Sequence, residues 1–129
     1  MNTTVLSDGE WKIMKHLWQN APQTLGMLSG ALLAETGWSK STVFVMLKRL
    51  IAKNAVRMEE DGRYQQYYPV LKQKEAADGE TDSFLSRVYN GSVSMMVSSM
   101  AGRSGLSKEE IDALRRILDE AEAKGGGKS

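Results

Sequence analysis

The 129-residue sequence predicts a mainly α-helical protein that carries one small β-hairpin. Three observations lead to this prediction. Apolar residues recur at helical spacing up to about residue 54, the spacing falls to about two over residues 55–70, and helical spacing then returns. Three helices followed by a hairpin is the order of a winged helix-turn-helix domain, so we expect such a domain with a C-terminal helical dimerisation arm.

The first helix is predicted over residues 8–20. Ser7 is a suitable N-cap, and Glu10, three residues later, completes a capping box. The sequence Asn20-Ala21-Pro22 ends the helix, because the residue before proline disfavours the α conformation. Apolar side chains recur along one predicted face, at Trp11, Met14, Leu17 and Trp18.

The second and third helices are predicted to follow closely. Thr24 caps the second helix, and Gly37 stands where a left-handed C-terminal residue is expected. Ser39 caps the third, with Thr42 in the place of the capping-box glutamate, and this helix runs from Lys40 to a stop near Asn54. The short connection around Gly37 is typical of a helix-turn-helix. The inner face of the third helix is predicted to hold Val43, Met46, Leu47, Leu50 and Ile51.

The β-hairpin is predicted from residues 56–60 and 64–68. Asp61-Gly62 between them is a strong hairpin signal, and Pro69 closes the second strand. The winged helix-turn-helix domain is therefore expected over residues 1–70.

Residues 71–123 are predicted to form a helical dimerisation domain. Helices are expected over 72–89, 92–100 and 108–123, with a break at Asn90-Gly91 and with Ser107 and Glu110 as a further capping box. Residues 124–129 are rich in glycine and are expected to be a disordered tail. The helices are too short to bury their own apolar residues, which we expect to pack between two copies of the chain: Phe84, Leu85, Val88, Tyr89, Val93, Met96, Val97, Met100, Ile111, Leu114, Ile117 and Leu118.

The distribution of charge is more informative than the total. The net charge is only +1, but residues 36–58 contain five basic residues and no acidic residue. Most of this stretch is the predicted third helix, which a helix-turn-helix inserts into the major groove of DNA. A solvated basic face is the alternative, and the helix-turn-helix context favours DNA. The predicted contacts are Ser39, Lys40, Ser41, Thr42, Phe44, Val45, Lys48, Arg49 and, at the hairpin tip, Arg63.

Each class of predicted contact has a physical role. Ser39 and the free amides beside it suit a phosphate, although capping alone also explains Ser39. Lys40 and Ser41 can approach base edges or phosphates, whereas Lys48, Arg49 and Arg63 suit the DNA backbone, or for Arg63 the minor groove. Phe44 and Val45 are apolar on a face that is otherwise polar. They either pack against the second helix or the hairpin, or contact the methyl groups of thymine.

Composition argues against an enzyme and against secretion. The chain has no cysteine, which excludes disulfides, thiolate metal sites and cysteine nucleophiles, and His16 is its one histidine. We therefore expect no catalytic residue, no metal site and no cofactor. The N-terminal residues do not resemble a signal peptide and no apolar run is long enough to span a membrane, so a cytoplasmic location is expected.

Motifs in both halves of the sequence carry a family resemblance. They are Ser7-x-x-Glu10-Trp11-x-x-Met14-x-x-Leu17-Trp18, Thr36-Gly37-Trp38-Ser39-x-x-Thr42-Val43-x-x-Met46-Leu47-x-Arg49-Leu50, Gly62-Arg63, Tyr67-Tyr68-Pro69, Ser83-Phe84-Leu85, Val88-Tyr89-x-Gly91 and Leu106-Ser107-x-x-Glu110-Ile111-x-x-Leu114. On these motifs the chain resembles the penicillinase repressor family of bacterial transcription factors, which includes BlaI, MecI and the copper-responsive CopY branch, over residues 6–118.

The resemblance implies a homodimeric repressor that binds a dyad operator, often of a resistance or stress operon. In the family, a membrane sensor protease triggers cleavage of the dimerisation arm, commonly at an Asn-Phe bond, and Ser99-Met100 occupies that position here. The copper branch carries a C-terminal cysteine motif, and this chain has no cysteine. Two alternatives remain open: a winged-helix protein interaction module, and a repressor that responds to a small molecule bound between the arm and the wing.

Overall fold

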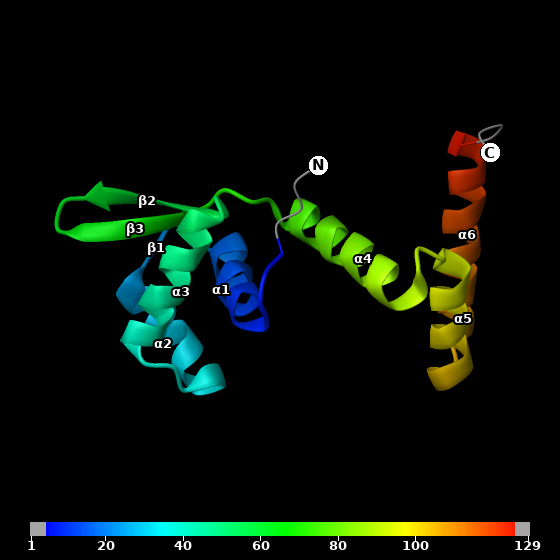
Figure 1. Ribbon diagram of the computed structural model, residues 1–129, viewed down its shortest axis with the longest axis horizontal. Coiled ribbons are helices and arrows are strands. Elements are labelled where there is room, and N and C mark those ends of the chain that lie inside the picture. The colour runs from blue at the N-terminus through cyan, green and yellow to red at the C-terminus, as the bar shows by residue number, and fades with distance from the viewer. Residues whose placement is uncertain (1–4, 126–129) are drawn as a thin grey trace. The chain divides into compact units, whose positions relative to one another are not determined.

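The computed structural model describes residues 5–125 (Figure 1). Helices and a small sheet follow one another in the order α1 (Asp8–Gln19), β1 (Gln23–Thr24), α2 (Leu25–Thr36), α3 (Lys40–Ala52), β2 (Val56–Asp61), β3 (Tyr64–Pro69), α4 (Gln73–Tyr89), α5 (Val93–Ser104) and α6 (Lys108–Gly125). The predicted fold class, a winged helix-turn-helix followed in the sequence by further helices, is confirmed.

The predicted N-caps are all present. At α1 the capping box is complete, since the Ser7 hydroxyl accepts the Glu10 amide at 3.2 Å and the Glu10 carboxylate accepts the Ser7 amide at 2.8 Å. Hydroxyl groups cap α2, α3 and α6 by accepting the amide three residues on, at Thr24, Ser39 and Ser107. These local bonds place the start of each helix where its sequence predicts it.

The turn between α2 and α3 depends on a left-handed residue. Gly37 has φ 70°, and its amide donates to the Leu33 carbonyl at 2.8 Å, which ends α2. Asn54 has φ 63° after α3, as the sequence predicts for a C-terminal stop. Gly37 therefore ends α2 before α3 begins, and Asn54 turns the chain after α3 toward the hairpin.

The wing is a three-stranded antiparallel sheet in the order β1-β3-β2. Asp61 pairs with Tyr64 across a two-residue turn, in which Gly62 supplies φ 64°. The sequence does not predict β1, because two residues are too short to show alternation. This strand pairs Gln23 with Tyr67, and the Gln23 side chain is buried while it donates to the carbonyls of His16 and Asn20.

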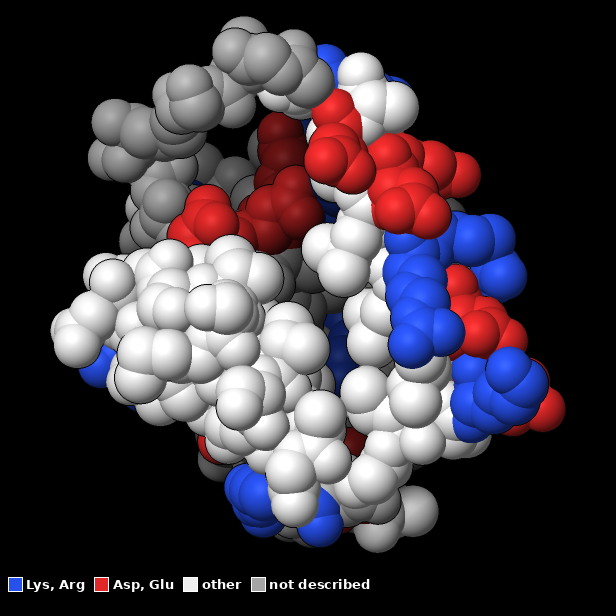
Figure 2. Space-filling model, turned by 90° about the vertical axis from the view of Figure 1, so that its right-hand side faces the viewer, with Lys and Arg blue, Asp and Glu red and all other residues white. Residues whose placement is uncertain are grey.

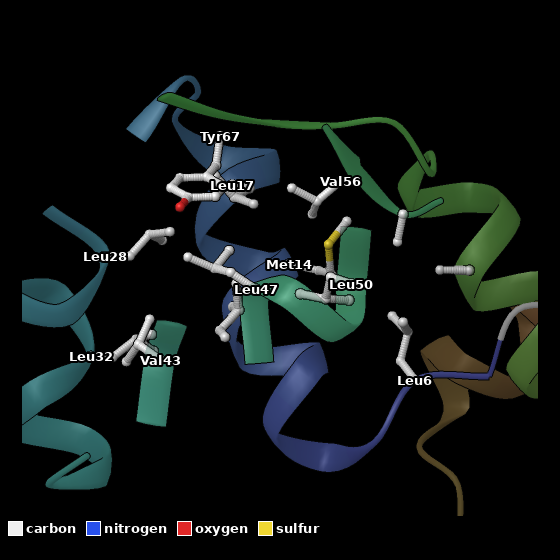
Figure 3. Close-up of a cluster of buried hydrophobic side chains, with 13 residues drawn as sticks. Leu6, Met14, Leu17, Leu28, Leu32, Val43, Leu47, Leu50, Val56 and Tyr67 are labelled. Carbon is white, nitrogen blue, oxygen red and sulfur yellow. The ribbon is translucent and has the colours of Figure 1, made fainter. Parts of the chain in front are cut away.

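The core lies where α1, α2 and α3 meet the sheet (Figure 3). Ile13, which the predicted apolar face of α1 omits, is fully buried, whereas Trp11 and Trp18 are half-buried and pack edge to face. The prediction for Ile51 is wrong, since its side chain is 36% exposed near the C-terminal end of α3. The buried side chains include Leu6, Met14, Leu17, Leu28, Leu32, Val43, Leu47, Leu50, Val56 and Tyr67.

The chain divides into two compact units, Met1–Ser83 and Phe84–Ser129, with the boundary inside α4. The predicted break after α4 is present, as Asn90 and Gly91 both have positive φ. Helix α5 is longer than predicted and ends at Ser104, and α6 continues through Lys124 and Gly125, which the sequence assigns to the tail. The remainder of that tail, residues 126–129, lies outside the described residues.

Candidate nucleic-acid interface

Helix α3 presents a defined outer face. Val43, Leu47 and Leu50 are completely buried on its inner side, which fixes the rotation of the helix about its own axis. Eight other side chains of α3 are exposed, and six of them are predicted contacts that form what we call its outer face: Lys40, Ser41, Phe44, Val45, Lys48 and Arg49. The other two are Ile51 and Ala52, close to the end of the helix.

The start of α3 combines a cap with free backbone donors. The Ser39 hydroxyl accepts a hydrogen bond from the Thr42 amide at 3.2 Å and lies 3.1 Å from the Thr42 hydroxyl. Both side chains are therefore hydrogen-bonded to each other within the cap. Thr42 is also half-buried. The amides of Lys40 and Ser41 are in the first turn, where a helix has no carbonyl to satisfy them. A phosphate at this position would therefore bind the backbone amides rather than the Ser39 side chain.

Phe44 and Val45 remain exposed, at 38% and 48%. Neither belongs to the core cluster or to the half-buried apolar side chains that pack against it. The Lys48 ammonium lies 5.5 Å from the centre of the Phe44 ring. Both side chains therefore keep a large accessible apolar surface on this face.

Two hollows flank the outer face of α3. Val45 lines a shallow hollow of about 300 Å³ together with Ser41, Thr42, Met46 and Arg49. Lys40 and Arg63 line a second one, of about 410 Å³, between the first turn of α2 and the hairpin. The fold thus brings the hairpin tip and the start of α3 to one groove, although they are distant in sequence.

The basic residues of the segment 36–58 have different roles in the fold. The Lys53 ammonium donates to the Glu10 carboxylate at 2.5 Å and to the Val5 carbonyl at 2.9 Å. Arg57 pairs with Glu59 and lies 4.1 Å from the centre of the Tyr68 ring. Two of the five positive charges are therefore balanced within the protein. Within residues 5–125, no ion pair involves Lys40, Lys48, Arg49 or Arg63.

The Glu10 carboxylate is the buried partner in this arrangement. Its side chain is 1% exposed, and burial alone would raise its pKa. The hydrogen bonds from Lys53 and from the Ser7 amide outweigh burial, so the pKa of Glu10 lies below its ordinary value. Lys53 consequently stabilises the junction of α1 and α3 and is not available to an external anion.

A second exposed surface lies on the C-terminal helices. Among the described side chains of residues 84–125, none is buried. Figure 2 looks onto α5 and α6 and shows a broad face without charged side chains beside a band of basic and acidic ones. Met95, which the predicted dimerisation set omits, is 56% exposed. Seven predicted dimerisation residues are exposed, namely Phe84, Val88, Val93, Val97, Met100, Ile117 and Leu118, and five are half-buried, namely Leu85, Tyr89, Met96, Ile111 and Leu114.

The Ser99-Met100 bond lies inside α5. Ser99 is half-buried and Met100 is 58% exposed. Because proteases bind extended backbone, this bond becomes accessible only when α5 unwinds locally.

Metal ligands and membrane-spanning helices are both absent from the described part of the chain. Residues 5–125 contain no group of three His, Asp or Glu side chains placed to hold a metal ion. None of the helices among them has the length and apolar character needed to cross a membrane.

Comparison with known proteins gives three concordant matches. The penicillinase repressor family model matches residues 6–120. The penicillinase repressor of Bacillus licheniformis is 34% identical over 115 residues, which cover 89% of this chain and 90% of that protein. The transcriptional regulator BlaI of Mycobacterium tuberculosis (strain H37Rv) is 35% identical over 127 residues, covering 97% and 91% of the two chains.

A solved structure matches part of the chain. It is the solution structure of the monomeric form of Bacillus licheniformis BlaI in complex with the blaP half-operator. The match has a TM-score of 0.51 and 28% identity, and it covers 57% of this chain and 90% of that one.

Proposed function

Since the chain belongs to the penicillinase repressor family, we propose that it is a homodimeric repressor that binds a two-fold symmetric operator through α3 and the hairpin. The observation that carries this proposal is the outer face of α3. It presents Lys40, Lys48 and Arg49 without an acidic partner, and Arg63 lies at the same groove as Lys40. We infer that the regulated operon is of the resistance or stress type, as the family resemblance implies.

Each exposed group has a suitable partner on DNA. The cations and the first amides of α3 would contact phosphates, which positions the protein, and the middle of the helix would face base edges in the major groove. The related BlaI structure is a complex of a monomer with a half-operator. That complex supports a model in which one winged domain of this chain binds one half of the operator.

The C-terminal helices would join two such domains. The C-terminal unit has no buried side chain among its described residues, so burial within one copy stabilises it little, and a second copy would cover its apolar face. A dimer would place two α3 helices about 34 Å apart, or a multiple of that distance, so that the second contact becomes nearly intramolecular. Loss of dimerisation would therefore release the operator, and this would occur in the cytoplasm, where bacterial DNA lies.

We further propose cleavage of the arm as one route to that loss. The candidate bond is Ser99-Met100, and the partner would be a membrane sensor protease of the kind that the family resemblance implies. The exposed Met100 side chain supports this position, and the helical conformation of the bond would keep cleavage slow until α5 unwinds.

Salt-dependent binding tests the DNA proposal. We expect the Lys40→Ala/Lys48→Ala variant to bind the duplex upstream of its own gene about tenfold more weakly than the wild type, measured by fluorescence anisotropy. The plot of log Kd against log salt concentration should also become shallower, by about one unit for each phosphate that the variant leaves without a cation.

The matched control is Lys72→Ala/Lys74→Ala, which removes the same charge from exposed positions at the start of α4. It should bind like the wild type. Equal weakening in both variants would indicate a general charge effect, and absence of salt-sensitive binding to any duplex would favour the protein interaction module.

A further inference from the structure

We propose that α3 selects its DNA sequence by apolar contact of Phe44 and Val45 with the C5-methyl groups of thymine. The inference rests on the proposed DNA-binding function and adds the chemical group that the helix recognises. Two large apolar side chains, 38% and 48% exposed, lie on a helix that also exposes Lys40, Lys48 and Arg49.

The fold itself does not require these two side chains. The buried core of α3 is complete with Val43, Leu47 and Leu50, and Phe44 and Val45 lie outside it. Exposing apolar surface has a free-energy cost in water, which an apolar contact in a complex removes. Residues 36–58 contain five basic residues and no acidic residue, so the charge of this face favours an anionic partner. A nucleic-acid duplex satisfies the charge requirement.

The positions of the residues along α3 match the geometry of major-groove recognition. Phe44 follows Ser41 by three residues and Val45 by four, so they lie next to Ser41 on the helix surface. Lys48 extends the same face by one turn, with its ammonium 5.5 Å from the Phe44 ring. The apolar pair therefore occupies the centre of the outer face, where a recognition helix meets base edges, and cations flank it.

Thymine is the base that suits such a centre. In the major groove every base pair presents hydrogen-bonding groups, and thymine alone adds a methyl group. A cytosine amino group placed against Phe44 or Val45 would lose its bond to water without a replacement, which disfavours it. Val45 also lines the open hollow with Ser41 and Arg49, and this hollow leaves room for a group that projects from the floor of the groove.

Removal of single methyl groups from DNA tests the inference. The full chain is first used to select a preferred duplex from a random library, and each thymidine is then replaced in turn by deoxyuridine, which lacks only the C5-methyl. We expect binding to weaken about three- to fivefold at one or two positions in each half-site. A thymine-to-cytosine change at the same position should weaken binding more, and 5-methylcytosine should restore part of the affinity.

Two variants separate a direct contact from a general effect. Val45→Ser removes both methyl groups of the side chain and introduces a hydroxyl, so we expect its ratio of thymidine to deoxyuridine affinity to fall toward one at the position that Val45 contacts. Leu33→Ser changes an apolar side chain of α2 that is 56% exposed, and should keep the wild-type ratio. If the wild type binds thymidine and deoxyuridine duplexes equally at every position, the inference is overturned and the proposed DNA-binding function still stands. If no duplex is enriched at any salt concentration, both the inference and the proposed function fail.

Discussion

Replacing Leu118 by Asp is expected to separate the dimer into monomers and to weaken binding to a full operator by about 100-fold or more. Leu118 is 64% exposed on α6, in a unit that buries none of its described side chains. In the proposed dimer this leucine is covered by the second copy, and a carboxylate there would be desolvated without a partner. Sedimentation velocity gives the oligomeric state, and anisotropy gives the affinity.

The control for this change is Leu33→Asp, which alters a leucine of α2 that is 56% exposed. It removes a similar exposed leucine and adds the same charge, and we expect it to remain dimeric. Binding of Leu118→Asp to a half-operator should match that of the wild type, because each winged domain is intact. A Leu118→Asp variant that still sediments as a dimer would contradict the role assigned to α6.

Replacing Lys53 by Met is expected to destabilise the protein by about 2–4 kcal/mol at pH 7, because it leaves a buried carboxylate unpaired. Lys53 donates to Glu10 at 2.5 Å, and the Glu10 side chain is 1% exposed. The Lys53 side chain itself is 35% exposed, so water offsets part of the loss and the effect falls toward the lower part of the range. Urea unfolding at one fixed protein concentration measures the change.

The same pair predicts a dependence on pH. The pKa of Glu10 in the folded protein lies below its ordinary value of 4.5. As the pH falls, the Glu10 carboxylate is therefore protonated in the unfolded chain before it is protonated in the folded one. The stability that the carboxylate contributes is therefore present above about pH 4.5 and is lost as the pH falls through the lower pKa of the folded state. Protonation also removes the charge that Lys53 balances, so the difference between the wild type and Lys53→Met should shrink in acid.

Lys12→Met is the matched control, because Lys12 pairs with Glu35 at 3.0 Å on the surface, with both side chains more than 40% exposed. An exposed pair contributes less than about 1 kcal/mol, so this variant should unfold nearly as the wild type does. Equal destabilisation by the two changes would show that burial of Glu10 is not what makes the Lys53 contact important.

The helices were predictable because their signals are local. Ser7, Thr24, Ser39 and Ser107 each cap through a bond to an amide three residues away, so a short window of sequence contains both partners. Strand β1 was not predictable in this way. Its pairing with β3 joins residues more than forty positions apart, and two residues show no periodicity of their own.

The outer face of α3 was predictable from helical spacing, which separates Val43 and Leu47 from Ser41 and Lys48. The residue that each charged side chain pairs with was not predictable from the sequence. Lys53 counts as part of a basic run in the sequence, and only the packing of α1 against α3 shows that it balances Glu10. Exposure of Phe44 likewise depends on what covers α3, which periodicity does not specify. Ile51 shows the same limit, as its spacing suggests the core and its place near the end of the helix exposes it.

Directed cleavage of DNA tests most directly whether α3 is the surface that faces the operator. The chain has no cysteine, so Ser41→Cys provides a single thiol for an iron–EDTA cleaving reagent on the outer face of α3, in its first turn. Glu122→Cys provides the matched site on an exposed position of α6. We predict two clusters of cuts, symmetric about the operator centre and about one helical turn or a multiple of it apart, from Ser41→Cys and none from Glu122→Cys. Bound DNA that Ser41→Cys leaves uncut, or that Glu122→Cys cuts instead, would contradict the account.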